Sequence, residues 1–390
     1  MQWIYLILFF ISLALITYNL LIYPVIIVVL SKIKHRSVIQ FTDEEQLPTL
    51  TLIVSAFQAA DTLEKKIHNC LRLFYPKGKL QIIFVSDKHD EQVQEILSRY
   101  RKQGIANLRK IKLNDNDQAF HLGGKLAQGA IIVFSHAHTD FNDMALVTLA
   151  KNLKGKNVGA VSGKHTVYES RNSHTSLSNN LYFKYESLIK SAESNLGSIT
   201  SADSEILAVK KSLFSGITDK QLNYDDAIVY KLARSGHRVI YEPNANAFSD
   251  TPDDIKDDFR TLSNKAKGFY RLIFSEWSNM FPPKTLFKFM FFSHRVLPLF
   301  MPFMLAILLG TSIALYQQPL VQIALYIQIG IYSLTFVNWF LRNNPIFRRY
   351  TSIIMYFVMM NIALFSGYLK YLLSAIKNLF SRKKQIKQST

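Results

Sequence analysis

Three long stretches without a charged residue constrain this fold more than any other feature of the sequence. They cover residues 1–31, 296–341 and 350–369. A helix needs roughly 20 apolar residues to cross a bilayer, so the first and third stretches each suffice for one span and the second for two. Residues 1–31 lack the basic start and the short apolar core of a cleaved signal peptide. We therefore predict an N-terminal transmembrane helix at 1–31 and a C-terminal transmembrane region of about three spans at 296–376.

The distribution of charge points to a membrane rather than to nucleic acid. The formal net charge is +18, yet no Asp or Glu follows Glu276, while twelve Lys and Arg residues do. Basic residues beside apolar spans belong at the cytoplasmic surface, so we expect membrane lipids as partners and no nucleic acid. The first positive charges, from Lys32 onward, place the N-terminus outside and the next domain in the cytoplasm of a bacterial-type inner membrane.

The basic tail at 377–390 conflicts with this count of spans. Three C-terminal spans would leave the tail outside, whereas its lysines and arginines favour the inside. One C-terminal segment is therefore expected to be re-entrant or interfacial. Residues 283–294 are rich in Phe with Lys284 and Lys288, as in an interfacial amphipathic helix. The single cysteine, Cys70, excludes an internal disulfide and a cysteine-rich zinc site.

Residues 50–280 alternate between apolar strand-like runs and helical patterns. The expected strands are 50–54, 80–85, a run containing Ile111, 131–134, 159–163 and 237–241, and the expected helices are 61–73, 91–101 and 227–233. This alternation predicts an α/β domain with a parallel sheet and helices on both faces. Ligands bind beyond the carboxyl ends of such strands. The polar residues that follow strand 131–134, namely His136, His138 and Asp140, should therefore face a ligand.

Several short blocks, in order from about Leu50 to about Pro302, resemble those of membrane-bound family 2 glycosyltransferases of the polysaccharide synthase type. They are Ser55-Ala-Phe-Gln-Ala-Ala60, Val85-Ser-Asp87, Leu122-Gly-Gly-Lys125, Ser201-Ala-Asp203, Tyr224-Asp-Asp226, a basic stretch from Asp258 to Arg271, and Phe292-Ser-His-Arg-Val-Leu-Pro298. The resemblance implies a GT-A fold, which is a Rossmann-like nucleotide-diphospho-sugar transferase fold.

The resemblance also implies roles for individual residues. Asp226 would be the general base that deprotonates the acceptor hydroxyl, with Asp225 in support and Asp203 near the acceptor. The remaining assignments concern the nucleotide-sugar donor: Phe57 stacks on the base, Asp87 bonds to it, and Lys125, His136, His138, Lys265 and Arg271 contact the rest.

The metal motif departs from the family. Relatives carry Asp-x-Asp, which holds Mg²⁺ or Mn²⁺ on the donor diphosphate; this chain reads His136-Ala-His138. Either His138, with Asp140, contributes to a site for a nitrogen-friendly metal, or the imidazoles meet the phosphates directly. Because Lys125 is near in sequence and no third ligand is evident beyond Asp140, the sequence favours direct contact.

The function implied is inverting transfer from a nucleotide sugar, a UDP-sugar for preference, to a lipid-linked or polysaccharide acceptor at the cytoplasmic membrane face. The alternative is a catalytically degenerate accessory subunit of a polysaccharide synthesis or export machine. The lost metal carboxylates favour that alternative, whereas the retained Asp87, Gly-Gly-Lys and Asp226 favour an enzyme.

Overall fold

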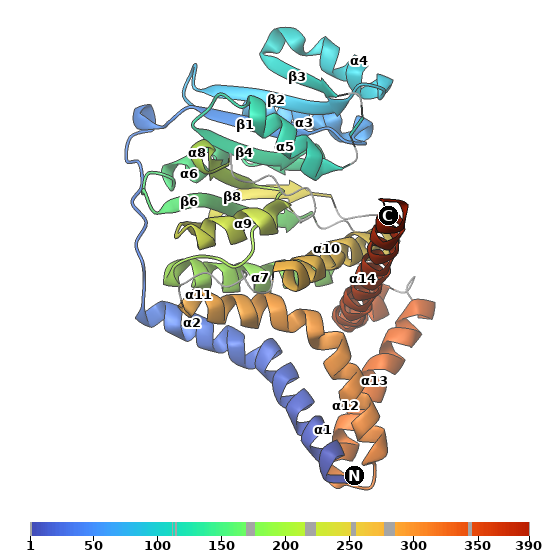
Figure 1. Cartoon of the computed structure of the whole chain (residues 1–390). Coiled ribbons are helices and arrows are strands. Elements are labelled where there is room, and N and C mark those ends of the chain that lie inside the picture. The colour runs from blue at the N-terminus through green and yellow to red at the C-terminus, as the bar shows by residue number, and fades with distance from the viewer. Residues whose placement is uncertain are drawn as a thin grey trace.

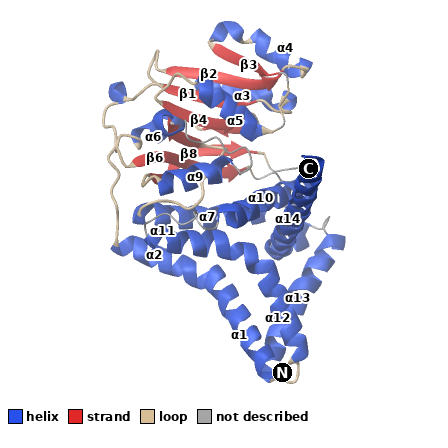
Figure 2. Cartoon of the chain, in the orientation of Figure 1, coloured by secondary structure: helices blue, strands red, loops and turns tan. Residues whose placement is uncertain are grey.

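The computed structural model describes residues 2–110, 112–113, 115–168, 176–214, 224–250, 255–276, 285–341 and 345–389. An α/β domain lies at one end, and the N-terminus lies at the other, among apolar helices (Figure 1). All the strands drawn belong to the α/β domain (Figure 2). The predicted fold class is therefore confirmed.

An eight-stranded sheet forms the centre of the domain, in the order β3-β2-β1-β4-β7-β6-β8-β5. The strands are β1 Leu50–Ser55, β2 Leu80–Asp87, β3 Ile105–Lys110, β4 Ile131–His136, β5 Thr139–Phe141, β6 Val158–Val167, β7 Leu207–Lys210 and β8 Arg238–Ser249. The prediction of an all-parallel sheet was wrong. β7 runs antiparallel to both β4 and β6, and β5 runs antiparallel to β8. Ile111, expected within a strand, lies outside the described residues.

Helices cover both faces of the sheet, as predicted. One face packs against α3 Ala60–Arg72, α4 Glu91–Arg99 and α6 Ala145–Lys151, and the other against α5 Asn116–Leu126, α7 Ser176–Leu196, α9 Tyr224–Arg234 and α10 Ile255–Glu276. Alternate residues of β1 serve the two faces, since Leu52 and Val54 join the first layer and Ile53 the second. Short elements complete the domain: η2 Glu44–Gln46, η3 Arg101–Gln103 and α8 Lys211–Phe214.

Four helical segments are long and apolar enough to cross a membrane: Gln2–Ile33, Thr285–Ala314, Pro319–Asn338 and Ile353–Lys377. The first comprises α1 Gln2–Thr17, the π-helical turn η1 Tyr18–Ile22 and α2 Tyr23–Ile33. The second runs through α11 Thr285–Phe291, η4 Phe292–Val296, η5 Leu297–Phe300 and α12 Met301–Ala314. The others lie in α13 Pro319–Leu341 and α14 Pro345–Ser389. The expected interfacial helix at 283–294 is thus continuous with the span that follows it.

The apolar helices share a core with the α/β domain. Tyr23 and Ile27 of α2 and Met290 of α11 belong to the same buried cluster as Ile53 and Phe134 of the sheet.

A polar bridge at His294 reinforces this junction. Its Nδ1 lies 2.9 Å from Oε1 of Glu193, and its Nε2 lies 3.1 Å from Oε2 of Glu186, both on α7. The Tyr23 hydroxyl donates to Glu193 over 2.6 Å, and the Thr200 backbone N–H donates to the same carboxylate over 2.9 Å. Two of the apolar segments therefore meet the α/β domain at one buried glutamate.

Candidate active site

The two histidines at the end of β4 lie side by side. β4 ends at His136, and the turn at Ala137 and His138 brings the second imidazole to the same side. Their ring centroids are 5.2 Å apart. His136 is buried, whereas half of the His138 side chain is exposed. The pair thus has one inner and one outer imidazole.

Glu205 completes a group of three. β7 pairs antiparallel with β4, and Phe134 lies opposite Leu207. Continuing this register two residues forward from Phe134 and two residues back from Leu207 brings Glu205 opposite His136. Oε1 of Glu205 lies 3.3 Å from Nε2 of His138 and 3.9 Å from Nε2 of His136. One ligand atom from each of the three side chains lies within 4.8 Å of the others, so the group could hold a metal ion.

The surroundings favour the ligand form of His136 and Glu205, whereas the Glu205 carboxylate raises the pKa of His138 and so favours its protonated form. Burial lowers the pKa of His136 to about 4, although the nearby Glu205 opposes that shift, so this imidazole is neutral at pH 7. Burial alone would raise the pKa of Glu205, but His136 and His138 outweigh it and hold that pKa well below its usual range. A neutral imidazole and a carboxylate are the forms that bind a cation.

One predicted donor contact, Lys125, lies elsewhere. Lys125 is exposed near the end of α5, and α5 runs back from the carboxyl ends of the strands toward their amino ends. Lys125 is therefore at the amino ends of the strands, whereas His136 is at the carboxyl end of β4. The preceding glycines face the protein: a Cβ on Gly123 would meet Cγ2 of Ile53 at 2.5 Å, and one on Gly124 would meet the Phe214 ring. They allow close helix–sheet packing rather than approach to a phosphate.

Asp140, the other predicted metal ligand, turns away from the histidines. Its Oδ2 lies 2.9 Å from Nζ of Lys65 on α3. The intervening Thr139 donates a hydrogen bond to Glu205 instead. Both reasons for preferring direct phosphate contact are thus removed, because Lys125 lies at the other ends of the strands and Glu205 offers a third ligand atom that the sequence did not reveal.

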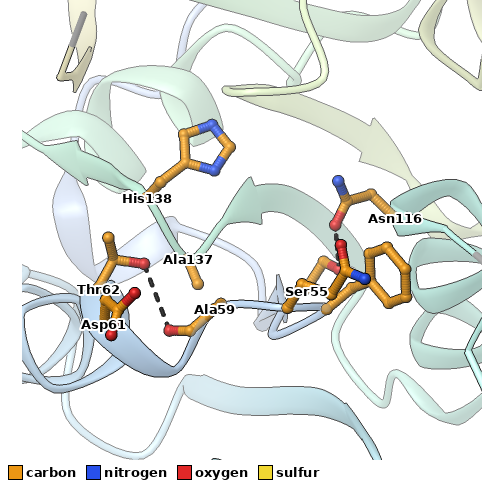
Figure 3. Close-up of a pocket in the computed structure, with 9 residues that line it drawn as sticks. Ser55, Ala59, Asp61, Thr62, Asn116, Ala137 and His138 are labelled. Atoms are coloured by element: carbon orange, nitrogen blue, oxygen red, sulfur yellow. Dashed lines mark hydrogen bonds between the residues drawn. The ribbon is translucent and has the colours of Figure 1, made fainter. Parts of the chain in front are cut away.

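A pocket of about 150 Å³ opens beside His138. Figure 3 shows its residues: Ser55, Phe57, Gln58, Ala59, Asp61, Thr62, Asn116, Ala137 and His138. The Ser55 hydroxyl donates to Oδ1 of Asn116 over 2.6 Å, which leaves the Asn116 NH₂ group for a ligand. Phe57 lies here as predicted, but Asp87 is not among the lining residues. Its carboxylate accepts the backbone N–H groups of His89 and Leu113, each at 2.9 Å.

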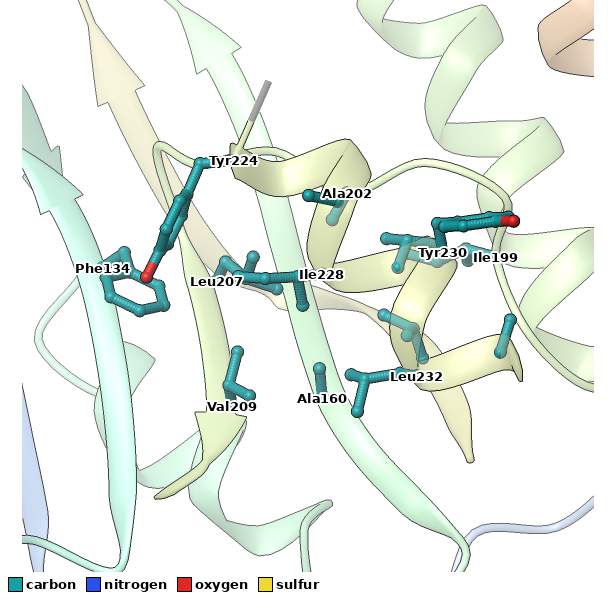
Figure 4. Close-up of a cluster of buried hydrophobic side chains, with 14 of the residues drawn as sticks. Phe134, Ala160, Ile199, Ala202, Leu207, Val209, Tyr224, Ile228, Tyr230 and Leu232 are labelled. Atoms are coloured by element: carbon teal, nitrogen blue, oxygen red, sulfur yellow. The ribbon is translucent and has the colours of Figure 1, made fainter. Parts of the chain in front are cut away.

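Asp225 and Asp226 begin α9, which is anchored on the sheet. Figure 4 shows Ile228 and Leu232 of α9 over β6 and β7, with the Tyr224 ring beside Phe134 of β4. The Tyr224 and Phe134 ring centroids are 5.3 Å apart. This contact holds the start of α9 next to the strand that carries His136.

The two carboxylates of this turn differ in their surroundings. Burial, and then the neighbouring Asp226, raises the pKa of Asp225 to about 6. Oδ1 of Asp226 instead lies 2.6 Å from Nη2 of Arg295, on the segment that enters α12. Asp117 accepts the backbone N–H of Tyr224, and burial raises its pKa to about 7.

Lys265 on α10 interacts electrostatically with two sets of carboxylates: Asp225 at the start of α9, and Asp203 and Glu205 near the histidines. Desolvation lowers the pKa of its ammonium, but Asp225, Asp203 and Glu205 outweigh this effect and raise it. Asp203 is paired with His165, whose Nδ1 lies 3.2 Å from Oδ2 of the carboxylate. Arg271 lies six residues beyond Lys265, and at 100° per residue it occupies a different face of α10.

Sequence reasoning did not identify Glu205, Asn116, His165 or Arg295 as site residues. A usable signal existed for Arg295, because an ionisable residue at the edge of a long apolar run is a functional candidate. Glu205 stands where relatives of the resembled family carry a small apolar residue. His165 and Asn116 had no comparable signal.

Comparison with known proteins agrees with this geometry. Residues 51–206 match the family model described as Glycosyl transferase family 2. The chain carries a family 2 glycosyltransferase domain. The α/β domain that contains residues 51–206 is called the family 2 domain below. The matched residues include the pocket and the group of His136, His138 and Glu205, which could form a metal-binding group.

The family 2 domain is also similar to curated polysaccharide synthases. The chain is 22% identical over 252 residues to a poly-beta-1,6-N-acetyl-D-glucosamine synthase of Staphylococcus epidermidis, covering 62% of this chain and 60% of that protein. It is 21% identical over 277 residues to the synthase of that name from Staphylococcus aureus, covering 68% and 65%. The matches thus span about 60–65% of the length of these relatives.

The fold has a solved counterpart. A mannosyltransferase from Pyrobaculum calidifontis, in complex with GDP-Man and Mn²⁺, superposes with a TM-score of 0.69 at 19% identity, covering 94% of this chain and 99% of that one. The GT-A fold expected from the sequence is confirmed, with apolar helices attached to it.

Proposed function

We propose that this chain transfers a sugar from a nucleotide-sugar donor to a lipid-linked or polysaccharide acceptor at the cytoplasmic membrane face, with inversion at the anomeric carbon. One observation carries the proposal: His138 belongs both to the pocket and to the His136–His138–Glu205 group. A nucleoside in the pocket would bring its diphosphate to that group. The sugar would then extend toward the carboxylates at the start of α9.

The metal-binding group fits a divalent cation, but not the all-oxygen set that Mg²⁺ prefers. Two imidazoles and one carboxylate suit Mn²⁺, Fe²⁺, Co²⁺ or Zn²⁺. We propose His136, His138 and Glu205 as the ligands. A bound cation would stabilise the charge of the leaving nucleoside diphosphate.

The chain's own residues would perform the remaining tasks. Phe57 would stack on the base, and Asn116 would donate to its polar edge or to the ribose. Asp226 would take the proton of the acceptor hydroxyl, with Asp225 beside it and Asp203 near the acceptor. Lys265 would keep these carboxylates ionised and attract the donor. In view of the relatives, a UDP-sugar is the proposed donor, and other polysaccharide synthesis proteins are proposed partners.

The proposal predicts binding and slow hydrolysis of a nucleotide sugar by the full chain in detergent. UDP-N-acetylglucosamine and GDP-mannose should be compared, each with Mn²⁺, Mg²⁺ or EDTA, by calorimetry and by release of UDP or GDP. We expect one nucleotide to bind and be cleaved with Mn²⁺. Failure of both nucleotides to bind under every metal condition would contradict the proposal.

Arg295 offers a test of how the base is positioned. Removing Arg295 would take from the buried Asp226 carboxylate a charged hydrogen bond that fixes its orientation. We therefore expect Arg295→Gln to misplace Asp226 and to lower kcat at least about tenfold, with an unchanged Kd for the nucleotide sugar. Arg295→Lys, which keeps the charge, should restore part of kcat. Equal loss in both variants together with weakened donor binding would indicate a merely structural residue.

A further inference from the structure

The path of α14 bears on how this chain crosses the membrane. By composition, Ile353–Lys377 could be a fourth span. The contacts of α14 describe a different course. α12 and α13 are joined by the turn Leu315–Gln318 at the end that holds the N-terminus, so their other ends lie toward the family 2 domain (Figure 1).

Over its first half, α14 contacts α13 and α12 near those domain-side ends. Asn338, close to the end of α13, donates to Thr351. Phe303, close to the start of α12, has its ring centroid 5.6 Å from that of Phe365 and 5.1 Å from that of Tyr368. At 1.5 Å per residue, α14 advances about 26 Å between Thr351 and Tyr368. If α14 crossed the membrane beside α12 and α13, it would over that distance reach the ends of those helices that lie away from the domain.

Meanwhile α14 packs against helices of the family 2 domain. Tyr356 lies 5.9 Å from Tyr182 of α7, measured between ring centroids. Ser263 of α10 donates to Ser366 over 3.1 Å, and Lys370 donates to Asn264 over 3.0 Å. A Cβ on Gly367 would meet the α10 backbone, with Ser263 O at 2.8 Å. α10 itself carries Lys265, so this part of α14 is held at the level of the candidate site.

One side of α14 carries an apolar stripe, which Phe303 of α12 borders at Phe365. Five exposed residues make it up: Ile362, Phe365, Leu369, Leu373 and Ile376. At 100° per residue they fall within about 80° of the helix circumference, and Lys370 and Lys377 lie beside them. A narrow apolar stripe bordered by lysines is typical of a helix that lies in the plane of a membrane interface.

We propose that α14 lies along the lipid interface on the domain side, with this stripe in the headgroup–acyl boundary of an anionic leaflet. The bilayer is then crossed by Gln2–Ile33, Thr285–Ala314 and Pro319–Asn338, and the basic tail lies on the same side as the family 2 domain. This arrangement resolves the conflict between span count and tail charge, because three spans leave the lysines and arginines of the tail on the side that basic residues favour.

Cysteine accessibility in intact cells tests the side of the tail. The only native cysteine, Cys70, is buried, so wild type serves as the unlabelled control. Single variants Lys377→Cys, Lys77→Cys in the domain and Gln317→Cys in the α12–α13 turn would be treated with a membrane-impermeant maleimide before and after permeabilisation. We expect residue 377 to behave like residue 77 and opposite to residue 317. Labelling of 377 together with 317 would overturn the proposal.

A depth measurement decides the matter independently. Ile362 lies within one turn of the centre of the candidate span, so spanning would put it at the bilayer midplane. A nitrobenzoxadiazole probe on Ile362→Cys, in vesicles containing phosphatidylglycerol, should be quenched at least about twofold more strongly by a nitroxide near the headgroup than by one near the chain end. Stronger quenching by the deep nitroxide would overturn the proposal, as would no quenching by either.

Discussion

Replacing Asp226 by Asn should lower the rate of sugar transfer by about 10²–10⁴-fold, while the Kd of the nucleotide sugar stays within about twofold of wild type. The amide has nearly the shape of the carboxylate, so it keeps an oxygen for Arg295, but it cannot accept the acceptor's proton. Single-turnover transfer and calorimetric donor binding would be measured on the same preparation.

Asp225→Asn is the matched control, because the two carboxylates are adjacent and both buried. We expect a smaller loss of transfer in this variant. If it loses more than Asp226→Asn, the base is Asp225, whose pKa of about 6 also suits proton abstraction near neutral pH. Wild-type transfer in both variants would remove this turn from the mechanism.

The second large effect concerns the metal-binding group. His138→Ala and Glu205→Gln should each weaken Mn²⁺ or Zn²⁺ binding by more than about 10–100-fold, the cost typical of losing an outer-shell partner alone. Metal content after dialysis, read by mass spectrometry, measures this directly. Donor affinity should decrease in the variants that lose the metal, and wild-type donor binding should be lost in EDTA.

Asp140→Asn is the control for the metal experiment. It removes a carboxylate two residues from His138, but one that is paired with Lys65. Metal content should therefore remain at the wild-type level. Loss of metal in Asp140→Asn with retention in Glu205→Gln would restore the ligand set inferred from sequence. If EDTA leaves donor binding unaffected in wild type, the imidazoles act on phosphate without a metal.

The fold could be predicted from the sequence wherever the spacing of apolar residues or the length of an uncharged run indicated an element. Uncharged runs revealed the apolar helices, and alternating apolar runs revealed β1, β2, β4, β6 and part of β8. β7 and β5 were missed because they have four and three residues, too few to show a pattern, and with them went the antiparallel pairing. The bent course of the second apolar segment is set by tertiary packing, not by composition.

The candidate site was predicted only where local order along the chain decided it. His136 and His138 were expected on one side of an extended segment, and although the chain turns at Ala137 and His138, the two rings do lie together. Glu205 reaches them through the register between β4 and β7, which no local pattern encodes. Lys125 was assigned to the diphosphate because its Gly-Gly-Lys block precedes β4. A helix that precedes a strand in this fold, however, ends near the amino end of that strand, away from the ligand.

The bridge at Glu193 determines where this protein can be divided. Residues 50–280 read as an independent catalytic unit, but truncation to that range would remove Tyr23 and His294 from a carboxylate that has no exposed surface. Glu193 would keep the Thr200 donors but lose both partners from the apolar helices, and each hydrogen bond to a charged group contributes about 1.5–3 kcal/mol, against the 5–15 kcal/mol by which proteins of ordinary stability are folded. The apolar helices are therefore not a detachable anchor. Unfolding of the catalytic half and release of its helices from one another should be a single event.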